Sequence, residues 1–226
     1  MIVSPALADA NNGNWRTARR WQELLTGRCE VRIAKAWPDA QAAGDDFMLA
    51  LHARRSAAAI AAWADRHPGR GLAVVLTGTD LYQDIATDAD AQRSLALAQR
   101  LVVLQERGPL ALPPQLRGKA RVIFQSTPAL EPLPKPADHL QAVMVGHLRA
   151  VKAPQTLWAA ARLLRERADI RIVHVGDAAG EPALAALAQE TARACPAYQW
   201  LGPLPHEETL RRIRSVSSWG RGPSHW

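Results

Sequence analysis

The sequence predicts an α/β protein with two parallel-sheet domains, of which the second is incomplete. Short apolar runs alternate with longer amphipathic runs along nearly all of its 226 residues, which is typical of strand–helix units around a parallel sheet. Hydrophobic residues make up 48% of the chain and charged residues 22%, so we expect a packed core rather than general disorder. At about 100 to 200 residues per domain, the length allows two modest domains.

The first domain is predicted to span residues 1–127. Its expected strands are Ile2–Ser4, Glu30–Ala34, Phe47–Leu51, Leu72–Leu76, Leu101–Leu104 and Arg121–Phe124. Its expected helices are Asn14–Leu25, Ser56–Arg66 and Asp90–Gln99. The first helix carries Trp15, Ala18, Trp21 and Leu25 as one apolar stripe, and Pro68 and Gly69 follow the second as stop signals.

A proline-rich segment predicts a linker at residues 128–139. Pro128, Pro132, Pro134 and Pro136 fall within nine residues, and this density sustains neither a helix nor an inner strand. The alternation then restarts over residues 140–216. The expected strands there are Ala142–Val145, Ile170–Val175 and Tyr198–Leu201, and the expected helices are Pro154–Arg167, Glu181–Ala194 and His206–Arg214. This gives two Rossmann-like domains followed by an irregular tail at 217–226.

Composition excludes several classes of protein. No window approaches the roughly 18 apolar residues of a membrane helix, and the first residues lack the features of a signal peptide, so we expect a cytoplasmic protein without membrane contact. Cys29 and Cys195 have no disulfide or zinc-ligand spacing. The net charge is +7, with 24 Arg and 4 Lys, which favours fork-shaped recognition of anions. No basic helix or aromatic-basic motif stands out, so nucleic acid is not an expected partner.

Polar loops at the carboxyl ends of the first-domain strands are the first candidate sites, because ligands of open α/β sheets bind there. Asn12, Gly13 and Asn14 precede a helix that carries Arg16, and amides at a helix N-terminus bind anions. Helix capping by Asn14 is the alternative interpretation.

Two further loops follow the third and fourth strands. The loop after the third strand contains His52, Arg54 and Arg55. The guanidinium groups of Arg54 and Arg55 suit a phosphate-like anion. Adjacent helical residues face different ways, so at most one of these Arg residues is expected to point inward. The second loop, Thr77, Gly78, Thr79 and Asp80, offers hydroxyls and a carboxylate to a substrate, or else caps the following helix.

A basic loop follows the first strand of the second domain. Gly146, His147, Arg149 and Lys152 provide a turn, cations and amide donors, which together suit a diphosphate. Other signatures are missing: the chain has no P-loop, no Gly-x-Gly-x-x-Gly after the first strand and no Gly-x-Ser-x-Gly elbow. Asp88 and Asp90 precede a helix, where capping is favoured over metal binding. We therefore assign no metal and no cofactor.

Several of these segments together resemble the bacterial selenosugar synthases of selenoneine biosynthesis, which are GT-B glycosyltransferases. The segments are Asn12-Gly13-Asn14 through Thr17-Ala18 to Arg20-Trp21, Leu51-His52-Ala53-Arg54-Arg55-Ser56, Leu76-Thr77-Gly78-Thr79-Asp80-Leu81-Tyr82, Gly146-His147-Leu148 with Lys152, and Leu201-Gly202-Pro203-Leu204-Pro205-His206-Glu207. The likeness covers roughly residues 2 to 216. In the similar family four glycosyltransferases a Gly-Arg-Leu…Lys loop holds the donor diphosphate; here His147 replaces that Arg, while Lys152 matches.

The resemblance implies a reaction in which a UDP-sugar, expected to be UDP-N-acetylglucosamine, gives its glycosyl group to selenophosphate. The substrate-binding residues would be Asn12, Gly13, Asn14, Arg16, Thr17, Arg54, Arg55, Thr77, Gly78 and Thr79. Gly146, His147, Arg149 and Lys152 would bind the donor phosphates, and His52 and Asp80 are the catalytic candidates. The alternatives are an ordinary UDP-sugar glycosyltransferase with a carbohydrate or lipid acceptor, and a non-catalytic fragment.

One departure from the family concerns the end of the chain. After the helix ending near Arg214, the family has another strand and an acidic loop that grips the donor, whereas this sequence continues as Ser217-Ser218-Trp219-Gly220-Arg221-Gly222-Pro223. This suggests truncation or a frame disruption. If the second sheet has the order 3-2-1-4-5-6, its first strand is then an uncovered edge, and this half is expected to be marginally stable, to self-associate as a homo-oligomer, or to be covered by another chain.

Overall fold

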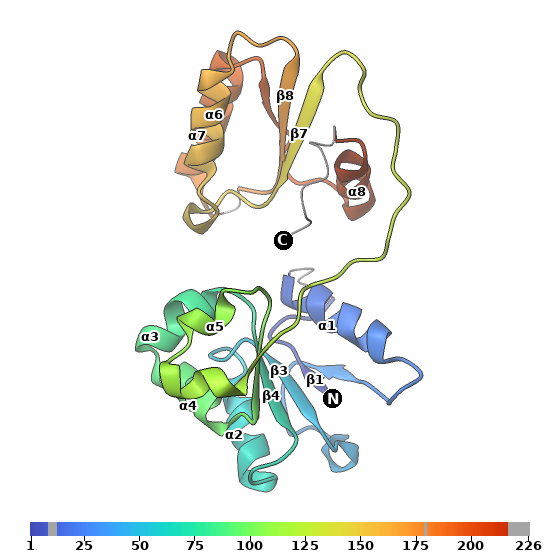
Figure 1. The fold of residues 1–226 in the computed structure, drawn as a ribbon, viewed down its shortest axis with the longest axis vertical. Helices are drawn as coiled ribbons and strands as arrows, with labels where there is room; N and C mark the ends of the chain where they lie inside the picture. The colour runs from blue at the N-terminus through green and yellow to red at the C-terminus, as the bar shows by residue number, and fades with distance from the viewer. Residues whose placement is uncertain (9–12, 179, 217–226) are drawn as a thin grey trace. The chain divides into compact units, whose positions relative to one another are not determined.

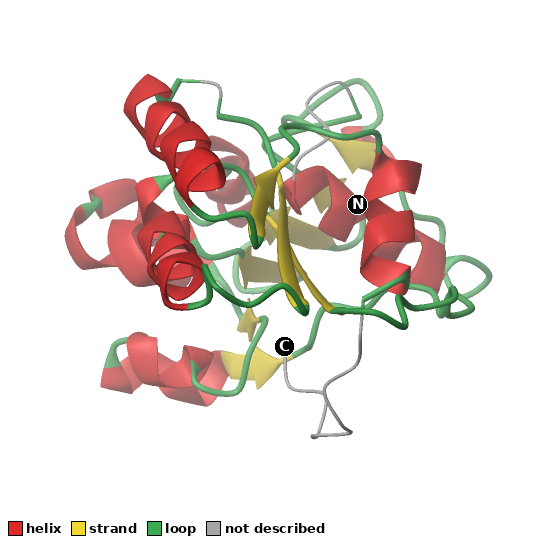
Figure 2. Ribbon diagram, turned by 90° about the horizontal axis from the view of Figure 1, so that it is seen from above, coloured by secondary structure: helices red, strands yellow, loops and turns green. Residues whose placement is uncertain are grey.

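The structure, a computed structural model, describes residues 1–8, 13–178 and 180–216. It shows an α/β chain that divides into two compact units, unit 1 from Met1 to Thr127 and unit 2 from Pro128 onward. Each unit has its own parallel sheet (Figure 1). Colouring by secondary structure shows these strands flanked by helices (Figure 2). Among the residues described, no helix is long and apolar enough to cross a membrane.

Unit 1 contains a six-stranded sheet in the order β2-β1-β3-β4-β5-β6. The strands are β1 (Ile2–Val3), β2 (Ile33–Ala34), β3 (Met48–Leu51), β4 (Leu72–Leu76), β5 (Arg100–Val103) and β6 (Ala120–Val122). The α-helices are α1 (Gly13–Leu25), α2 (Ala57–Arg66), α3 (Ile85–Thr87), α4 (Ala89–Leu97) and α5 (Gly108–Ala111). The other helical turns are η1 (Ala42–Gly44) and η3 (Pro114–Lys119), both 3-10, and η2 (Asp80–Asp84), a π-helix.

The core of unit 1 lies on both faces of this sheet. All five residues of β4 are buried, as expected for an inner strand covered on both sides. Leu72, Val74 and Leu76 pack in one cluster with Trp63 and other residues of the α2 side, whereas Val75 packs in a second cluster with residues of α1. Figure 1 shows α1 on one side of the sheet and α2 to α5 on the other. The carboxyl ends of the strands are therefore held in a fixed array.

Unit 2 contains a three-stranded parallel sheet in the order β7-β8-β9. Its strands are β7 (Leu140–Val145), β8 (Ile170–Val175) and β9 (Tyr198–Trp200). Its helices are α6 (Pro154–Leu163), α7 (Pro182–Ala194) and α8 (His206–Arg214), with the 3-10 turn η4 (Ala150–Lys152). Helices α6 and α7 cover one face of the sheet, and α8 lies beside β7 on the other (Figure 1).

Strand β7 forms one edge of this sheet in the part of the chain that the structure describes, as predicted. It carries no charged residue, and the side chain of Val145 is 48% exposed. Apolar edges of this kind promote association between chains.

Element boundaries differ from the predicted ones in a few places. The run Glu30–Ala34 forms only the two-residue strand β2, because β1 offers only Ile2 and Val3 as pairing partners. The helix predicted to end at Arg167 ends at Leu163. The short helical segments η2, α3 and α5 were not predicted, since each is too short for a periodic apolar pattern.

Candidate functional site

The candidate residues of unit 1 lie where its strands end, and they fall into two groups. One group surrounds the ends of β3 and β4, and the other lines a small pocket beside α1. A third group, in unit 2, follows β7. Asn12 lies outside the described residues.

Asp80 joins the loops that follow β3 and β4. Its side chain is fully buried, and one carboxylate oxygen, Oδ1, accepts hydrogen bonds from the backbone N–H groups of Thr77 and Gly78, each at 2.9 Å. The other oxygen, Oδ2, accepts the N–H of Ala53 at 3.0 Å. A buried carboxylate with three amide donors is well satisfied. Asp80 therefore positions the two loops, and its predicted catalytic role stays a prediction.

His52 occupies the first position after β3 and is also buried, at 2% exposure. Its backbone has a φ of 72°, a left-handed conformation that is uncommon for a residue with a side chain. Ring atom Nδ1 accepts the backbone N–H of Arg55 at 3.4 Å, so in the neutral ring Nε2 carries the proton. Nε2 then donates to the hydroxyl of Thr79 at 3.2 Å.

The electrostatics of His52 favour its neutral form. Burial lowers the pKa of His52 below its ordinary value of 6.5, and the positive charges of Arg55 and Arg54 lower it further, against the opposing effects of Asp80 and Asp84. A neutral imidazole is able to accept a proton at neutral pH. His52 is buried, so its ring contacts the exposed Thr79 and does not itself reach the surface.

Asp84 belongs to this group, although the sequence did not single it out. The π-helix η2 places its Oδ2 atom 3.9 Å from Nε2 of His52 and 3.2 Å from Nε of Arg54. That oxygen is buried and has no hydrogen-bond partner among the described residues, so the contact with Arg54 is ionic. π-Helical turns occur frequently at functional sites. This turn, which the structure shows and the sequence pattern does not, is the feature that draws attention to Asp84.

Two arginines extend from this group toward solvent. Arg54 is 47% exposed on its side chain and is partly neutralised by Asp84. Arg55 is also exposed, and its guanidinium makes no ion pair or hydrogen bond with the residues that the structure describes. Both arginines are exposed, so neither points inward. Arg55 is the better placed of the two to bind an external anion, because it has no ion pair with the residues that the structure describes.

The second group in unit 1 lines a pocket of about 150 Å³. Predicted residues Gly13, Arg16 and Thr17 contribute to it, together with Arg20, Trp21, Gln125 and Ser126, which were not predicted as ligands. The hydroxyl of Thr17 donates to the carbonyl of Gly13 at 2.9 Å and accepts from Nε2 of Gln125 at 2.9 Å, so it organises the pocket wall. Nε of Arg20 donates to Ser126 at 3.2 Å. Asn14 lies in the first turn of α1.

The basic loop of unit 2 runs from Gly146 to Lys152 and is tied to the end of β8. The N–H of Gly146 donates to Val175, that of Leu148 donates to Asp177, and the N–H of Asp177 donates to Nδ1 of His147 at 3.2 Å. Arg149 and Lys152 are exposed on this loop. The loop thus presents two cations at the carboxyl ends of the strands, which is the geometry predicted for an anion site.

Gly176 allows the loop after β8 to approach the Gly146–Lys152 loop after β7 this closely. A Cβ atom at this position would lie 1.9 Å from the carbonyl oxygen of Gly146 and 2.9 Å from the N atom of His147. A Cβ atom at these distances would force the backbone of one of the two loops to shift. The sequence suggested only a turn at this position, because a close approach between two loops depends on the tertiary fold.

A buried relay of side chains supports the same loop from below. Nε1 of Trp158 donates to the hydroxyl of Tyr198 at 3.1 Å, and Nε2 of His174 donates to the carbonyl of Gly146 at 3.1 Å. Nδ1 of His174 must then accept from the Tyr198 hydroxyl, 3.0 Å away. Burial lowers the pKa of His174 and raises that of Tyr198, so both groups are neutral at pH 7.

In the described segments, no group of three or more His, Cys, Asp or Glu side chains gathers. Asp88 caps α4, since its carboxylate accepts the N–H of Ala91 at 2.8 Å, which confirms the capping interpretation. Searches of family models and of curated proteins give no match to this chain.

Proposed function

We propose that the chain is a glycosyltransferase of the GT-B type that transfers a sugar from a UDP-sugar, UDP-N-acetylglucosamine in the first instance, to selenophosphate. Unit 2 would bind the donor diphosphate and unit 1 the acceptor. The observation that carries the proposal is the Gly146–Lys152 loop, with two exposed cations at the end of β7 on a backbone held by Gly176 and the His174 relay.

The donor loop suits a leaving diphosphate. As the bond between the sugar and UDP breaks, negative charge develops on the phosphate oxygens, and fixed positive charges lower the energy of that state. Arg149 and Lys152 supply these charges in the proposal, and the protonated Nε2 of His147 supplies a further donor, because its Nδ1 is occupied by the N–H of Asp177.

The acceptor groups suit a small anion with several charges. Arg55 is exposed and unpaired among the described residues, and Arg16 and Arg20 line the pocket beside α1. A carbohydrate acceptor would be expected to meet aromatic platforms and hydroxyl groups instead. Arg55, Arg16 and Arg20 therefore support selenophosphate, whereas Trp21 and the hydroxyls of Thr17 and Ser126 in the same pocket are the groups that a sugar acceptor would use.

In the proposed reaction the selenium atom attacks the anomeric carbon. A carbon–selenium bond forms, the bond from that carbon to the UDP oxygen breaks, and its electron pair leaves with UDP. Water then cleaves the selenium–phosphorus bond, which releases phosphate and the 1-selenosugar. The proton released in that second step goes to solvent, because Nε2 of His52 already donates to the Thr79 hydroxyl and Nδ1 already accepts the Arg55 N–H.

A mass-spectrometric assay tests this proposal. The chain is incubated with UDP-N-acetylglucosamine and selenophosphate, and UDP and the selenosugar are quantified against a reaction in which phosphate replaces selenophosphate. We expect both products only with selenophosphate. UDP release without a selenosugar, at the same rate in both reactions, would remove selenophosphate as the acceptor and favour an ordinary glycosyltransferase. No UDP release in either reaction would contradict glycosyl transfer by this chain.

A further inference from the structure

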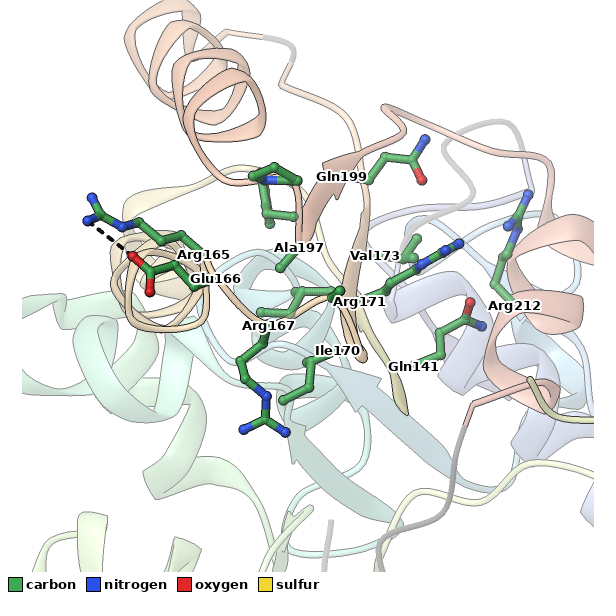
Figure 3. A pocket seen from close by; sticks show the side chains of 14 residues that line it. Gln141, Arg165, Glu166, Arg167, Ile170, Arg171, Val173, Ala197, Gln199 and Arg212 are labelled. Atoms are coloured by element: carbon green, nitrogen blue, oxygen red, sulfur yellow. Dashed lines mark ion pairs between the residues drawn. The ribbon is translucent and has the colours of Figure 1, made fainter. Parts of the chain in front are cut away.

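A groove of about 670 Å³ lies on unit 2 where its strands begin (Figure 3). It is lined by the first residues of the three strands and by the loop between α6 and β8, residues 165–168. Because the strands are parallel, this edge is opposite to the one that carries the Gly146–Lys152 loop. The groove is therefore separate from the proposed donor loop.

Most charges in the groove already have partners, but one does not. Arg167 binds Asp169 through two hydrogen bonds of 2.7 and 2.6 Å and lowers the pKa of that carboxyl to about 2. Arg212 donates to Glu208 at 3.0 Å, and Arg165 lies 3.6 Å from Glu166. Arg171 makes no hydrogen bond or ion pair with the residues described, and its charge acts on Asp138 only at longer range.

The position of Arg171 is unusual for a structural residue. It lies on the central strand β8, hydrogen-bonded between β7 and β9, and alternation along β8 sends Ile172 and His174 toward the α6 and α7 side while Arg171 faces the other way. Gln141 pairs with Arg171 in the register, and Gln199 pairs with its neighbour Val173. Arg171 is exposed, whereas Val173, the next residue of β8 on this face, is buried, so the polar part of this face is its amino end.

Side chains rich in N–H groups surround the same hollow. Arg171, Gln141, Gln199 and Arg212 all border it and come from three strands and α8 (Figure 3). An apolar helix laid over this face would bury the Arg171 guanidinium without a partner, which is strongly unfavourable. An anion would satisfy it. Nε2 of Gln141 already donates to the Ser215 hydroxyl at 3.3 Å, and Nε of Arg212 to Glu208. The N–H groups of Arg171, with the remaining ones of Arg212 and the Gln199 amide, still exceed the two oxygen atoms of a carboxylate, whereas a phosphate group offers three.

We propose that this groove binds a small molecule carrying a phosphate or diphosphate group, with Arg171 as the principal anion contact and Arg212, Gln141 and Gln199 around it. The volume lies within the roughly 300 to 1,000 Å³ typical of small-molecule sites. The site is independent of the donor loop and does not depend on the proposed glycosyl transfer.

Isothermal titration of the full chain with pyrophosphate and with ADP tests the proposal, and adenosine serves as the uncharged probe. All three variants below are made in a Lys152→Ala background, which weakens pyrophosphate binding at the proposed donor loop. We expect saturable binding of pyrophosphate and ADP, but not of adenosine, in that background. Arg171→Gln should raise Kd about tenfold or more, because it removes a charge-assisted contact.

The matched control is Arg165→Gln, an exposed arginine on the rim of the same groove, which should change Kd less than about threefold. Arg171→Lys keeps the charge but not the fork and should fall between wild type and Arg171→Gln, with the fold of each variant checked by circular dichroism. The proposal is overturned if Lys152→Ala abolishes all binding of pyrophosphate, or if Arg171→Gln and Arg165→Gln weaken binding equally.

Discussion

Replacing Asp80 by Asn removes one charge from a fully buried cluster and measures how strongly that carboxylate holds the ends of β3 and β4 together. The Asn oxygen retains the Thr77 and Gly78 N–H groups at the Oδ1 position. Its amide nitrogen then faces the N–H of Ala53, so that donor loses its acceptor. Losing one charge-assisted hydrogen bond costs about 1.5 to 3 kcal/mol, and the other two bonds weaken. We expect Asp80→Asn to lower the free energy of unfolding by about 2 to 5 kcal/mol.

The assay is urea unfolding of the full chain, with hydrogen exchange at the amides of Ala53, Thr77 and Gly78 to locate the effect in unit 1. Asp88→Asn is the matched control, because Asp88 also accepts a backbone N–H but Asn caps a helix about as well. It should change the free energy of unfolding by less than about 0.5 kcal/mol. A change for Asp80→Asn no larger than that of the control would refute the positioning role.

Three further outcomes are expected. Gly176→Ala should displace the Gly146 loop, because its Cβ would lie 1.9 Å from the Gly146 carbonyl oxygen. The variant should therefore bind UDP more weakly than wild type when the two are compared by titration, and an unchanged affinity would contradict the close approach. His52 and His174 both have a lowered pKa, so the unfolded chain binds more protons and stability should fall as pH drops below about 6.5; urea midpoints at pH 7.5 and 5.5 should differ less in His174→Gln than in wild type. Arg55→Ala should raise the KM for selenophosphate at least tenfold and leave UDP-sugar affinity unchanged, and Lys152→Ala should do the reverse; equal losses of both would count against the placement.

Local patterns were sufficient to predict most of the strands and helices. The helix at His206–Arg214 has the predicted bounds, and the apolar run Leu72–Leu76 is the central strand β4, because apolar runs and stop signals act over a few residues. Strand β2 was overestimated because its length depends on β1, its partner in the sheet. Pairing between distant segments does not appear in a local pattern.

The candidate site was predictable only as a set of loops. The residues after β3, β4 and β7 follow from the rule that ligands meet the carboxyl ends of parallel strands. The rule does not say which side chains turn inward. The π-helical turn Asp80–Asp84 buries Asp80 and places Asp84 beside His52. Gln125 donates a hydrogen bond to Thr17, which lies 108 residues away in the sequence. The groove around Arg171 lies at the amino ends, where that rule does not apply.

The glycine at position 176 also bears on how such a chain can diverge. It contacts the Gly146 loop, its N–H donates to Gly202, and its carbonyl accepts from Nε1 of Trp200, so the segments after all three strands of unit 2 meet at one residue. Inherited changes in ligand preference would therefore accumulate in exposed side chains such as Arg149 and Lys152, while the path of the backbone beneath them stays constant. In a lineage of related chains, we expect this position to tolerate no replacement even where the neighbouring cations are exchanged.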